Sequence, residues 1–494
     1  MFRTSAITSI FTPLMAKPRN TTNSLIGRLS EHKRLRDLLE TKESELVAIM
    51  GRRRVGKTFL VKNVYQHELV FHITGIQNAK RKVQLENFIE ARNTFFPKSK
   101  SWDSPKNWFQ AFSQLKTLLS HITKKKKVLF FDELPWMATG STEFLKTFDH
   151  FWNAWAVDQN VIVVICGSAT SWMISNIIKD IGGLHNRVTQ RLFLMPFTLR
   201  ETESYFASRQ IQMPRYSILQ IYMAMGGIPF YLREVKRGES AVQAIDRVFF
   251  GKQAALHGEF DNLYKALFKN HPRHIEVIRA LAKQWRGLTR HEIIDSTSFY
   301  TGGGLSVILD ELESSNFIQS YIPYGKKARE KIYRLIDEYS LFYIHFIEQN
   351  KNQALYWKKK HNTPVVKTWS GYAFESLCMK HVEGIKKKLG ISGIYTHEAS
   401  FVKRKDKATA GCQIDMLIDR ADNAVNICEM KFYNGQYTLT ANDVKELQQK
   451  RNVFQLATGS KKQLFITLVT TNGIYPNKYA HIIDNHVEMD ALFL

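Results

Sequence analysis

Short apolar runs alternate with amphipathic stretches over residues 25–235. The runs lie at Leu46–Met50, Leu69–Thr74, Val128–Phe131 and Val161–Cys166. Apolar runs of this length, separated by helix-length segments, are typical of a parallel sheet with helices between its strands. The pattern therefore predicts an α/β domain, which we place at residues 25–260.

A mostly helical block follows over residues 261–350. The predicted elements are three helices, at His274–Trp285, Leu288–Asp295 and Leu305–Leu312, and two strands, at Phe317–Ile322 and Ile332–Leu335. Thr289 and Glu292 have the spacing of a capping box at the start of the second helix. Three helices followed by a β-hairpin predict a central winged-helix domain.

Strands return in the last block, residues 351–494. They are predicted at Gln413–Ile418, Asn426–Phe432 and Gln463–Thr470, with a tight turn near Ala421–Ala424. At the other end, residues 1–24 are basic and lack the clear cleavage site of a targeting peptide, so we expect a disordered leader. The fold class that follows is an α/β multidomain protein.

Charge and cysteine usage narrow the class of partner and compartment. Lys and Arg number 70 against 45 Asp and Glu, a net charge of +25, which favours nucleic acid over the alternatives of solubility or an anionic membrane. The four cysteines (Cys166, Cys378, Cys412, Cys428) have no metal-ligand spacing and predict buried thiols in a reducing compartment. No apolar run approaches the ~18 residues of a membrane helix. We expect a soluble, cytoplasmic protein with no membrane partner.

A phosphate-binding motif, G-x-x-x-x-G-K-T, lies between the first apolar run and a predicted helix. Its residues are Gly51, Arg52, Arg53, Arg54, Val55, Gly56, Lys57 and Thr58. Glycines let the backbone wrap a phosphate, and amides at the helix N-terminus point at the anion. Lys57 would reach the terminal phosphates and Thr58 would hold Mg²⁺. The motif therefore predicts a P-loop that binds ATP with Mg²⁺.

Two further strands end in polar side chains at the same predicted sheet edge. Val128–Phe131 is followed by Asp132 and Glu133, which we interpret as the Mg²⁺-ordering acid and the residue that orients or deprotonates the attacking water. The alternative is a strand-ending turn with two solvated acids. Ser168 follows the strand at Val161–Cys166 and is predicted to sense the γ-phosphate, with a simple helix cap as the alternative.

Taken in order, the segments 26–28, 51–58, 128–137, 164–172, 184–187 and 226–229 resemble the archaeal and bacterial AAA+-related ATPases close to the STAND signalling ATPases. The resemblance implies that Arg187 is an arginine finger acting on a neighbouring subunit, with Arg191 as the nearest competitor. It also implies that Gly227 and Pro229 belong to the lid beside the adenine. A finger acting in trans implies a nucleotide-dependent homo-oligomer.

The predicted winged helix has two open roles. As a DNA reader it would place its third helix in the major groove and its wing, with Lys326, Lys327 and Arg329, on phosphates. That third helix, however, carries Asp310, Glu311 and Glu313 and no arginine. A rigid spacer or protein contact is the alternative.

The last block carries a second set of chemistry. Asp415 and Glu429 are separated by thirteen residues, and Lys431 lies two residues further on, facing the same side of the strand as Glu429. A hairpin would gather the three side chains, and carboxylate oxygens with a lysine suit Mg²⁺-assisted phosphodiester cleavage. The bland alternative is a surface salt bridge between Asp415 and Lys431.

This second set resembles the PD-(D/E)xK nuclease superfamily, which implies a restriction-endonuclease-like α/β fold. The resemblance implies that Glu375 completes the metal site with Asp415 and Glu429, and that the helix around Lys445–Lys450 supplies phosphate contacts. Ile414 stands where the superfamily usually has a proline.

Together these patterns predict a P-loop ATPase coupled to a DNA-binding, Mg²⁺-dependent nuclease-like domain. The alternative is a STAND-like signalling or scaffold switch whose last domain binds DNA or a partner without cutting. DNA is favoured over RNA as the nucleic-acid partner.

Overall fold

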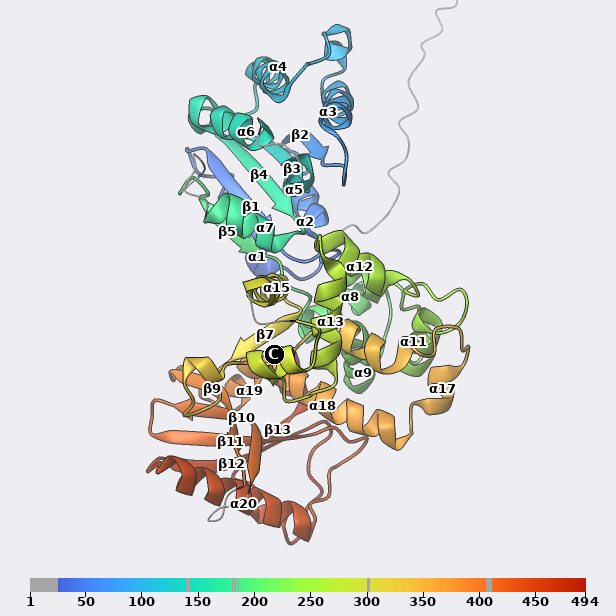
Figure 1. Cartoon of the computed structure of the whole chain (residues 1–494), viewed down its shortest axis with the longest axis vertical. Coiled ribbons are helices and arrows are strands. Elements are labelled where there is room, and N and C mark those ends of the chain that lie inside the picture. Colours follow the sequence, from blue (N-terminus) through green and yellow to red (C-terminus); the bar gives the residue numbers. More distant parts are fainter. Residues whose placement is uncertain (1–24, 139–142, 180–183, 185, 300–302, 406–410) are drawn as a thin grey trace, which may run out of the picture.

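The computed structural model describes residues 25–138, 143–179, 184, 186–299, 303–405 and 411–494. The predicted leader lies outside these residues. Figure 1 shows a parallel-sheet domain at one end of the molecule, a helical region in the middle and a second sheet at the other end.

The first sheet has five parallel strands in the order β2-β3-β4-β1-β5. The strands are β1 (Glu45–Met50), β2 (Leu69–Thr74), β3 (Lys127–Asp132), β4 (Val161–Gly167) and β5 (Gln190–Phe193). Four of them confirm the predicted strands to within one residue at each end. The edge strand β5 was not predicted, because only Leu192 of its four residues is buried and no apolar run marks it.

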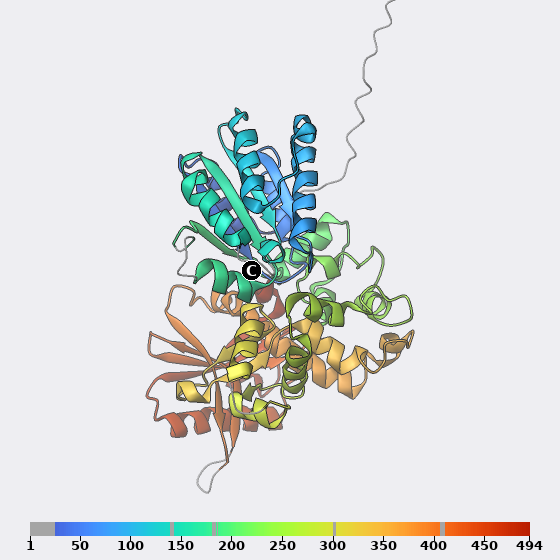
Figure 2. The same cartoon turned by 45° about the horizontal axis from the view of Figure 1, so that its top comes forward.

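Alternating residues of β1 enter two different cores. Val47 and Ile49 pack with α1 (Leu29–Asp37) and α2 (Lys57–Val64). Leu46, Ala48 and Met50 pack on the opposite face under an aromatic cluster. That face is covered by α3 (Arg81–Phe95), α4 (Trp108–Ser120) and α6 (Glu143–Ala154), seen in front of the sheet in Figure 2.

The segment predicted as the lid follows β5 and is made of helices. They are α8 (Leu199–Ser208), α9 (Arg215–Met225), α10 (Pro229–Leu232), α11 (Ala241–Phe249) and α12 (Glu259–Leu267). Gly227 lies against the chain before α8: a Cβ built on it would be 1.9 Å from the Phe197 carbonyl oxygen. The Phe197 amide donates to the Gly227 carbonyl at 2.6 Å, so only glycine fits at this crossing.

The middle block contains three helices and a hairpin, as the sequence predicts, except that the second helix begins at Arg290 rather than Leu288 because Leu288–Thr289 form a short strand. They are α13 (His271–Ala282), α14 (Arg290–Asp295), α15 (Gly303–Ser314), β7 (Ile318–Tyr321) and β8 (Ile332–Leu335), with β6 (Leu288–Thr289) pairing with β8. The predicted capping box of Thr289 and Glu292 is confirmed. Two of the acids on α15 bind within the domain: Glu311 contacts His274 Nε2 at 2.7 Å, and Glu313 accepts from the Ser320 amide at 2.7 Å.

The hairpin packs on the last domain. Beyond β7, the Tyr324 amide donates to the Ser400 carbonyl at 2.8 Å, and the Tyr324 ring lies 5.3 Å from that of Phe454. Lys326, Lys327 and Arg329 remain exposed at its tip. The two parts of this hairpin therefore differ, since one contacts protein and the other faces solvent.

The second sheet is mixed, with the order β13-β12-β11-β10-β9. Its strands are β9 (Thr396–Lys403), β10 (Cys412–Arg420), β11 (Ala424–Lys431), β12 (Gln463–Thr470) and β13 (Asn485–Glu488). The predicted hairpin of β10 and β11 is confirmed as an antiparallel pair, with Asn423 at φ 64° in its turn. Helices α18 (Pro364–Lys380), α19 (Val382–Lys388) and α20 (Ala441–Thr458) pack around this sheet.

The segment joining the middle and last blocks is helical and packed. It contains α16 (Glu338–Phe342), η5 (Tyr343–Ile347) and α17 (Tyr356–Lys360). The Trp357 amide donates to Asp246 Oδ1 of α11 at 2.9 Å, which attaches α17 to the lid. The buried side chains of the lid, the middle block and α18 form one continuous core, so these parts move against each other only if that core opens.

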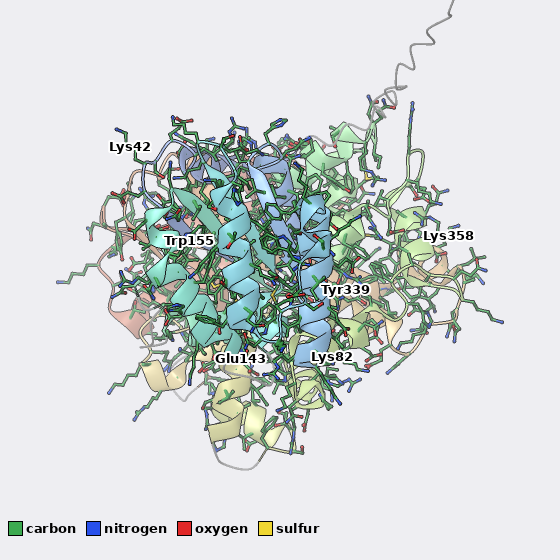
Figure 3. The ribbon with its side chains drawn as sticks, turned by 90° about the horizontal axis from the view of Figure 1, so that it is seen from above. Lys42, Lys82, Glu143, Trp155, Tyr339 and Lys358 are labelled. Carbon is green, nitrogen blue, oxygen red and sulfur yellow. The ribbon has the colours of Figure 1, made fainter. Side chains whose placement is uncertain are left out.

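Other predictions from composition have simple outcomes. Cys166, Cys378 and Cys428 are buried free thiols, and Cys412 is half-buried and also free. Of the helices that the structure describes, none combines the length and apolar character that crossing a membrane requires. Basic side chains such as Lys42 and Lys358 lie toward the periphery in Figure 3, whereas Tyr339 lies inside.

Candidate functional site

The phosphate loop joins β1 to α2 and closes on its own lysine. Gly51 and Gly56 have φ values of 145° and 97°, and a Cβ on Gly51 would lie 2.4 Å from the Leu194 carbonyl oxygen. Lys57 is buried, and its Nζ donates to the carbonyls of Gly51 at 2.7 Å and Arg52 at 3.1 Å. The loop is therefore shaped to enclose an anion, with Lys57 held at its rim by backbone oxygens that a phosphate would replace.

Thr58 and Asp132 come together at the start of α2. The Thr58 hydroxyl donates to Asp132 Oδ2 at 2.7 Å, and Asp132 Oδ1 accepts from the Glu133 amide at 3.1 Å. A hydroxyl and a carboxylate are the hard oxygen donors that Mg²⁺ takes at a nucleotide site. The two predicted metal residues of the first domain thus fit that ion.

Glu133 is held by Ser168. Its Oε2 accepts from both the amide and the hydroxyl of Ser168, each at 2.9 Å, and Ser168 is buried at the end of β4. Glu133 itself has φ 49°, a backbone conformation that non-glycine residues seldom adopt and that functional sites often retain. Ser168 therefore orients Glu133, and its predicted contact with a γ-phosphate stays a prediction.

A cavity of about 610 Å³ opens beside the phosphate loop. Sequence reasoning predicted its P-loop residues, Glu133 and Pro229, but missed most of its other wall. The missed lining side chains include Arg28, Phe59, Phe197, Tyr205, Arg209, Phe230 and Arg233. Arg233 lies four residues after Pro229, about one helical turn, and this spacing is the only feature of the sequence that could have placed Arg233 beside Pro229. The cavity has the volume and mixed aromatic–basic lining that a nucleotide requires.

The three arginines of the P-loop do not share one role. Arg53 and Arg54 line the cavity, and Arg54 also pairs with Glu259 of α12 and lies 3.8 Å over the Phe230 ring. The Arg52 side chain is not part of the cavity lining. We predicted that Arg52 binds the cofactor, but its guanidinium is buried in an ion pair with Asp337, so its backbone alone belongs to the phosphate loop.

Arg187 and Arg191 lie on the surface of the first domain, outside the cavity lining. The Arg187 amide donates to the Leu184 carbonyl at 3.0 Å, and its side chain is exposed. The role of Arg187 as an arginine finger stays a prediction.

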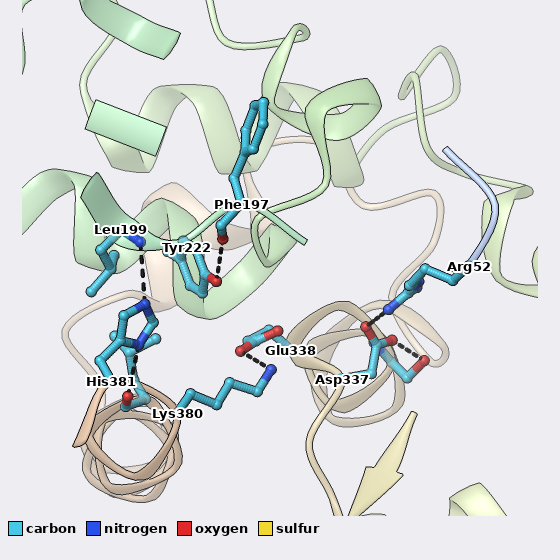
Figure 4. A network of polar contacts seen from close by, with 10 residues as sticks. Arg52, Phe197, Leu199, Tyr222, Asp337, Glu338, Lys380 and His381 are labelled. Carbon is cyan, nitrogen blue, oxygen red and sulfur yellow. Dashed lines mark hydrogen bonds and ion pairs between the residues drawn. The ribbon is translucent and has the colours of Figure 1, made fainter. Parts of the chain in front are cut away.

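Polar contacts connect the phosphate loop with α18 (Figure 4). Asp337 pairs with Arg52 and accepts from the Ser340 amide at 2.9 Å, which caps α16. The adjacent Glu338 pairs with Lys380 at 2.5 Å. Burial raises the pKa of Glu338, although Lys380 opposes that rise. Burial would also raise the pKa of Asp337, but the Arg52 charge and the hydrogen bonds from Arg52 and Ser340 together outweigh it and lower the pKa.

The end of α18 also contacts the lid. Burial lowers the pKa of His381 to about 4, so the ring is neutral at physiological pH. Its Nδ1 lies 2.9 Å from the Leu377 carbonyl, to which it donates, and its Nε2 accepts from the Leu199 amide at 3.2 Å. The Tyr222 hydroxyl donates to the Phe197 carbonyl at 2.7 Å in the same region (Figure 4).

The predicted residues of the last domain do gather. Lys431 Nζ lies 3.0 Å from Glu429 Oε1, and Gln413 donates to Asp415 Oδ1 at 2.7 Å. Burial together with the charges of Asp415 and Glu429 raises the pKa of Glu375 to about 8. Glu375 on α18, Asp415 on β10 and Glu429 on β11 therefore lie close enough for their charges to interact.

Two basic residues that sequence reasoning did not assign to this cluster also enter it. Lys450 of α20 lies 2.6 Å from Glu429 Oε2, and Arg334 of β8 opposes the rise in the pKa of Glu375. Both Glu429 oxygens are thus paired with lysines. Within the described part of the chain, no group of three or more His, Cys, Asp or Glu side chains is arranged to hold a metal ion. The cluster in this arrangement does not fit the predicted metal.

The parallel sheet, the closed phosphate loop and the acid pair at the end of β3 define a P-loop ATPase domain. Residues 25–235 match a protein family described as an ATPase domain predominantly from Archaea. An uncharacterized protein of Methanocaldococcus jannaschii is 24% identical over 328 residues, covering 66% of this chain and 69% of that protein.

Two solved structures are similar in outline. The Walker-type ATPase of Pyrococcus abyssi has a TM-score of 0.49 at 18% identity, covering 67% of this chain and 99% of that chain. The ORC2 protein of Aeropyrum pernix, in ADPNP–ADP complexes, has a TM-score of 0.41 at 14% identity, covering 69% of this chain and 98% of that chain.

Proposed function

We propose that this protein is an ATP-binding and ATP-hydrolysing switch whose nucleotide state controls a nucleic-acid-binding C-terminal domain. The single observation that carries the proposal is the buried ion pair between Arg52 of the phosphate loop and Asp337. Glu338, the residue next to Asp337, pairs with Lys380 at the end of α18, the helix that carries Glu375.

The chemistry of the first site follows from its contacts. Phosphates entering the loop would take Lys57 Nζ away from the Gly51 and Arg52 carbonyls. Thr58 and Asp132 would hold Mg²⁺, which supplies charge neutralisation at the phosphates. Glu133, oriented by Ser168, would align a water and accept its proton.

The same step gives a physical reason for coupling. Lys57 donates a hydrogen bond to the carbonyl of Arg52, and the side chain of Arg52 pairs with Asp337. When a phosphate withdraws Lys57, Arg52 therefore loses a backbone contact. A buried charge pair cannot be stretched without a large cost, so a shift of the loop transmits to Asp337 and Glu338. Glu338 then carries the shift to Lys380 at the end of α18.

Nucleic acid is the proposed partner of the last two blocks. The net charge of +25 supplies the long-range attraction, and DNA is favoured over RNA. In the winged-helix interpretation, the exposed Lys326, Lys327 and Arg329 contact phosphate. Tyr324 on the same hairpin fixes the wing to the last domain. The wing and the last domain would therefore approach the nucleic acid together.

Cutting is a second candidate function, supported by the gathering of Glu375, Asp415, Glu429 and Lys431. The PD-(D/E)xK interpretation requires a free Glu429 carboxylate, whereas Lys431 and Lys450 both pair with it here. Cleavage would therefore require at least one lysine to leave Glu429.

The exposed Arg187 supports assembly into a homo-oligomer, because an arginine finger acting in trans completes the nucleotide site of a neighbouring copy.

The test compares nucleic-acid affinity across nucleotide states. Fluorescein-labelled duplex and single-stranded DNA are titrated with the full chain in ADP and in a non-hydrolysable ATP analogue with Mg²⁺. We expect affinities that differ by roughly fivefold or more between the two states, the usual range of allosteric coupling. Lys57→Ala should abolish the difference because it cannot hold the terminal phosphates.

Equal affinity in both states would contradict the switch. A parallel cleavage arm with Mg²⁺ or Mn²⁺, on DNA and RNA, separates the second candidate. Cutting that disappears in Asp415→Ala and Glu429→Ala establishes a nuclease, and no cutting with intact nucleotide control leaves the switch alone.

A further inference from the structure

A second large cavity, of about 790 Å³, lies between the lid and the C-terminal domain. Helices α9 and α11 form one side, and α17, α18 and the chain after β11 form the other. None of its lining residues lines the P-loop cavity or belongs to the carboxylate cluster. Its role is therefore separate from nucleotide binding at Lys57.

The lining is aromatic and without acids. Five of its side chains are rings: Tyr216, Trp357, Trp369, Phe432 and Tyr433. The others are Lys367, His361, four neutral polar side chains and four aliphatic ones (Met223, Val242, Ile245, Val366), and no Asp or Glu occurs among the described lining residues. Rings and amides without carboxylates suit a planar ligand that carries hydrogen-bonding edges and negative charge.

Two rings already form a stack in the wall. The Tyr216 and Phe432 ring centroids are 5.1 Å apart with the planes 12° from parallel. Trp369, also in this wall, is buried and adds a third aromatic side chain to it. A planar ring system suits a wall of this kind.

The cavity is connected to the carboxylate cluster through Phe432. Phe432 follows Lys431 directly, and its ring lies 5.6 Å from that of Phe374, the residue before Glu375. Tyr433 continues toward the cluster as well, since its ring lies 6.1 Å from that of Tyr437, over which Lys431 Nζ lies at 5.9 Å. A nucleic-acid strand that contacts Lys431 would thus place its neighbouring nucleotide at this cavity.

The charge around the cavity agrees with a polyanion. The three consecutive lysines of α17, Lys358–Lys360, are exposed, and Lys358 projects at the periphery in Figure 3. Lys367, on the first turns of α18, is exposed at the cavity itself. Stacking rings beside a basic surface form the usual combination for single strands, in which bases stack and phosphates contact lysines.

We infer that this cavity binds an unstacked base of a single-stranded nucleic acid whose backbone lies along Lys367 and Lys358–Lys360. The inference rests on the proposed nucleic-acid function and adds the form of the ligand, a single strand with one nucleotide turned out of its stack. Removing a base from its stack costs least in single strands, so single strands should bind more tightly than duplex here.

The experiment measures anisotropy of a fluorescein-labelled dT20 with the full chain in EDTA, without Mg²⁺. Tyr433→Ala is the test variant because this ring is 52% exposed and its loss should leave the fold intact. We expect affinity to fall about tenfold, within the range for loss of one stacked base. Tyr395→Ala, at a tyrosine 82% exposed and outside the cavity, is the matched control and should not change it.

A second readout locates the base. A dT20 carrying one 5-iodouracil is photo-crosslinked and the adducts are mapped by mass spectrometry. Adducts on Tyr216, Trp357, Phe432 or Tyr433 support the inference. Adducts confined elsewhere, or equal affinities of Tyr433→Ala and Tyr395→Ala, overturn it. Thymidine monophosphate that displaces the probe as effectively as unlabelled dT20 would also overturn it, since the ligand would then be a free nucleotide.

These outcomes are independent of cutting and of ATP. In EDTA no metal-dependent cleavage occurs, so a protein that never cuts still gives the expected binding result. Conversely, nucleotide-controlled binding of duplex DNA together with adducts outside the cavity would preserve the switch and reject this site.

Discussion

Glu133→Gln should lower the rate of ATP hydrolysis by roughly 100- to 10,000-fold while ATP affinity is retained. Glutamine keeps the shape of the side chain and can still accept from Ser168. It cannot take the proton of an attacking water, so only the chemical step is lost. Hydrolysis is measured by phosphate release and affinity by titration with a fluorescent ATP analogue.

Glu90→Gln is the matched control for that result. Glu90 is an exposed acid on α3 of the same domain and lies outside the cavity lining, so its substitution should leave both quantities unchanged. A loss below about tenfold in Glu133→Gln would contradict its role as the general base.

Asp337→Ala should lower the free energy of unfolding by about 3–5 kcal/mol, because it leaves the Arg52 guanidinium buried without its partner. Asp337 and Arg52 are 2% and 3% exposed, so water cannot replace the missing carboxylate. The loss of the α16 cap at Ser340 adds to the effect. Native-state hydrogen exchange, read on peptides around α16, measures it.

A double-mutant cycle separates the ion pair from the cap. Asp337→Asn keeps a side-chain acceptor for Ser340, and Arg52→Met removes the charge with similar volume. The double variant should be more stable than the sum of the single losses predicts, by at least ~1 kcal/mol. Arg279→Ala, which breaks a partly exposed pair with Glu348, should cost at most ~1 kcal/mol, and a similar loss at Asp337 would contradict the buried-pair argument.

The parts of the fold that were predictable are those with local signals. Apolar runs such as Leu46–Met50 and Val161–Cys166 mark buried parallel strands by composition alone. The spacing of Gly51, Gly56 and Lys57 marks the phosphate loop because the loop is built from consecutive residues. The hairpin of β10 and β11 was predictable because its turn is short and its strands are apolar.

The parts that were not predictable depend on contacts between distant segments. Arg52 and Asp337 are 285 residues apart, and nothing near Arg52 distinguishes it from Arg53 or Arg54. Lys450 reaches Glu429 only because α20 packs against the second sheet. The sequence does not show this packing, and from the sequence alone Lys450 was therefore predicted to contact phosphates. The strand β5 has one buried side chain and carries no periodic pattern.

The most direct test of the switch is hydrogen–deuterium exchange of the peptides that cover α18, with and without ATP and Mg²⁺. Wild type is compared with Arg52→Met, under conditions in which both bind ATP. We predict that ATP changes exchange at the end of α18, around Lys380, in wild type, and that Arg52→Met loses this response while binding ATP. The same exchange at α18 with and without ATP in wild type, or an unchanged response in Arg52→Met, would contradict control of the C-terminal domain through the phosphate loop.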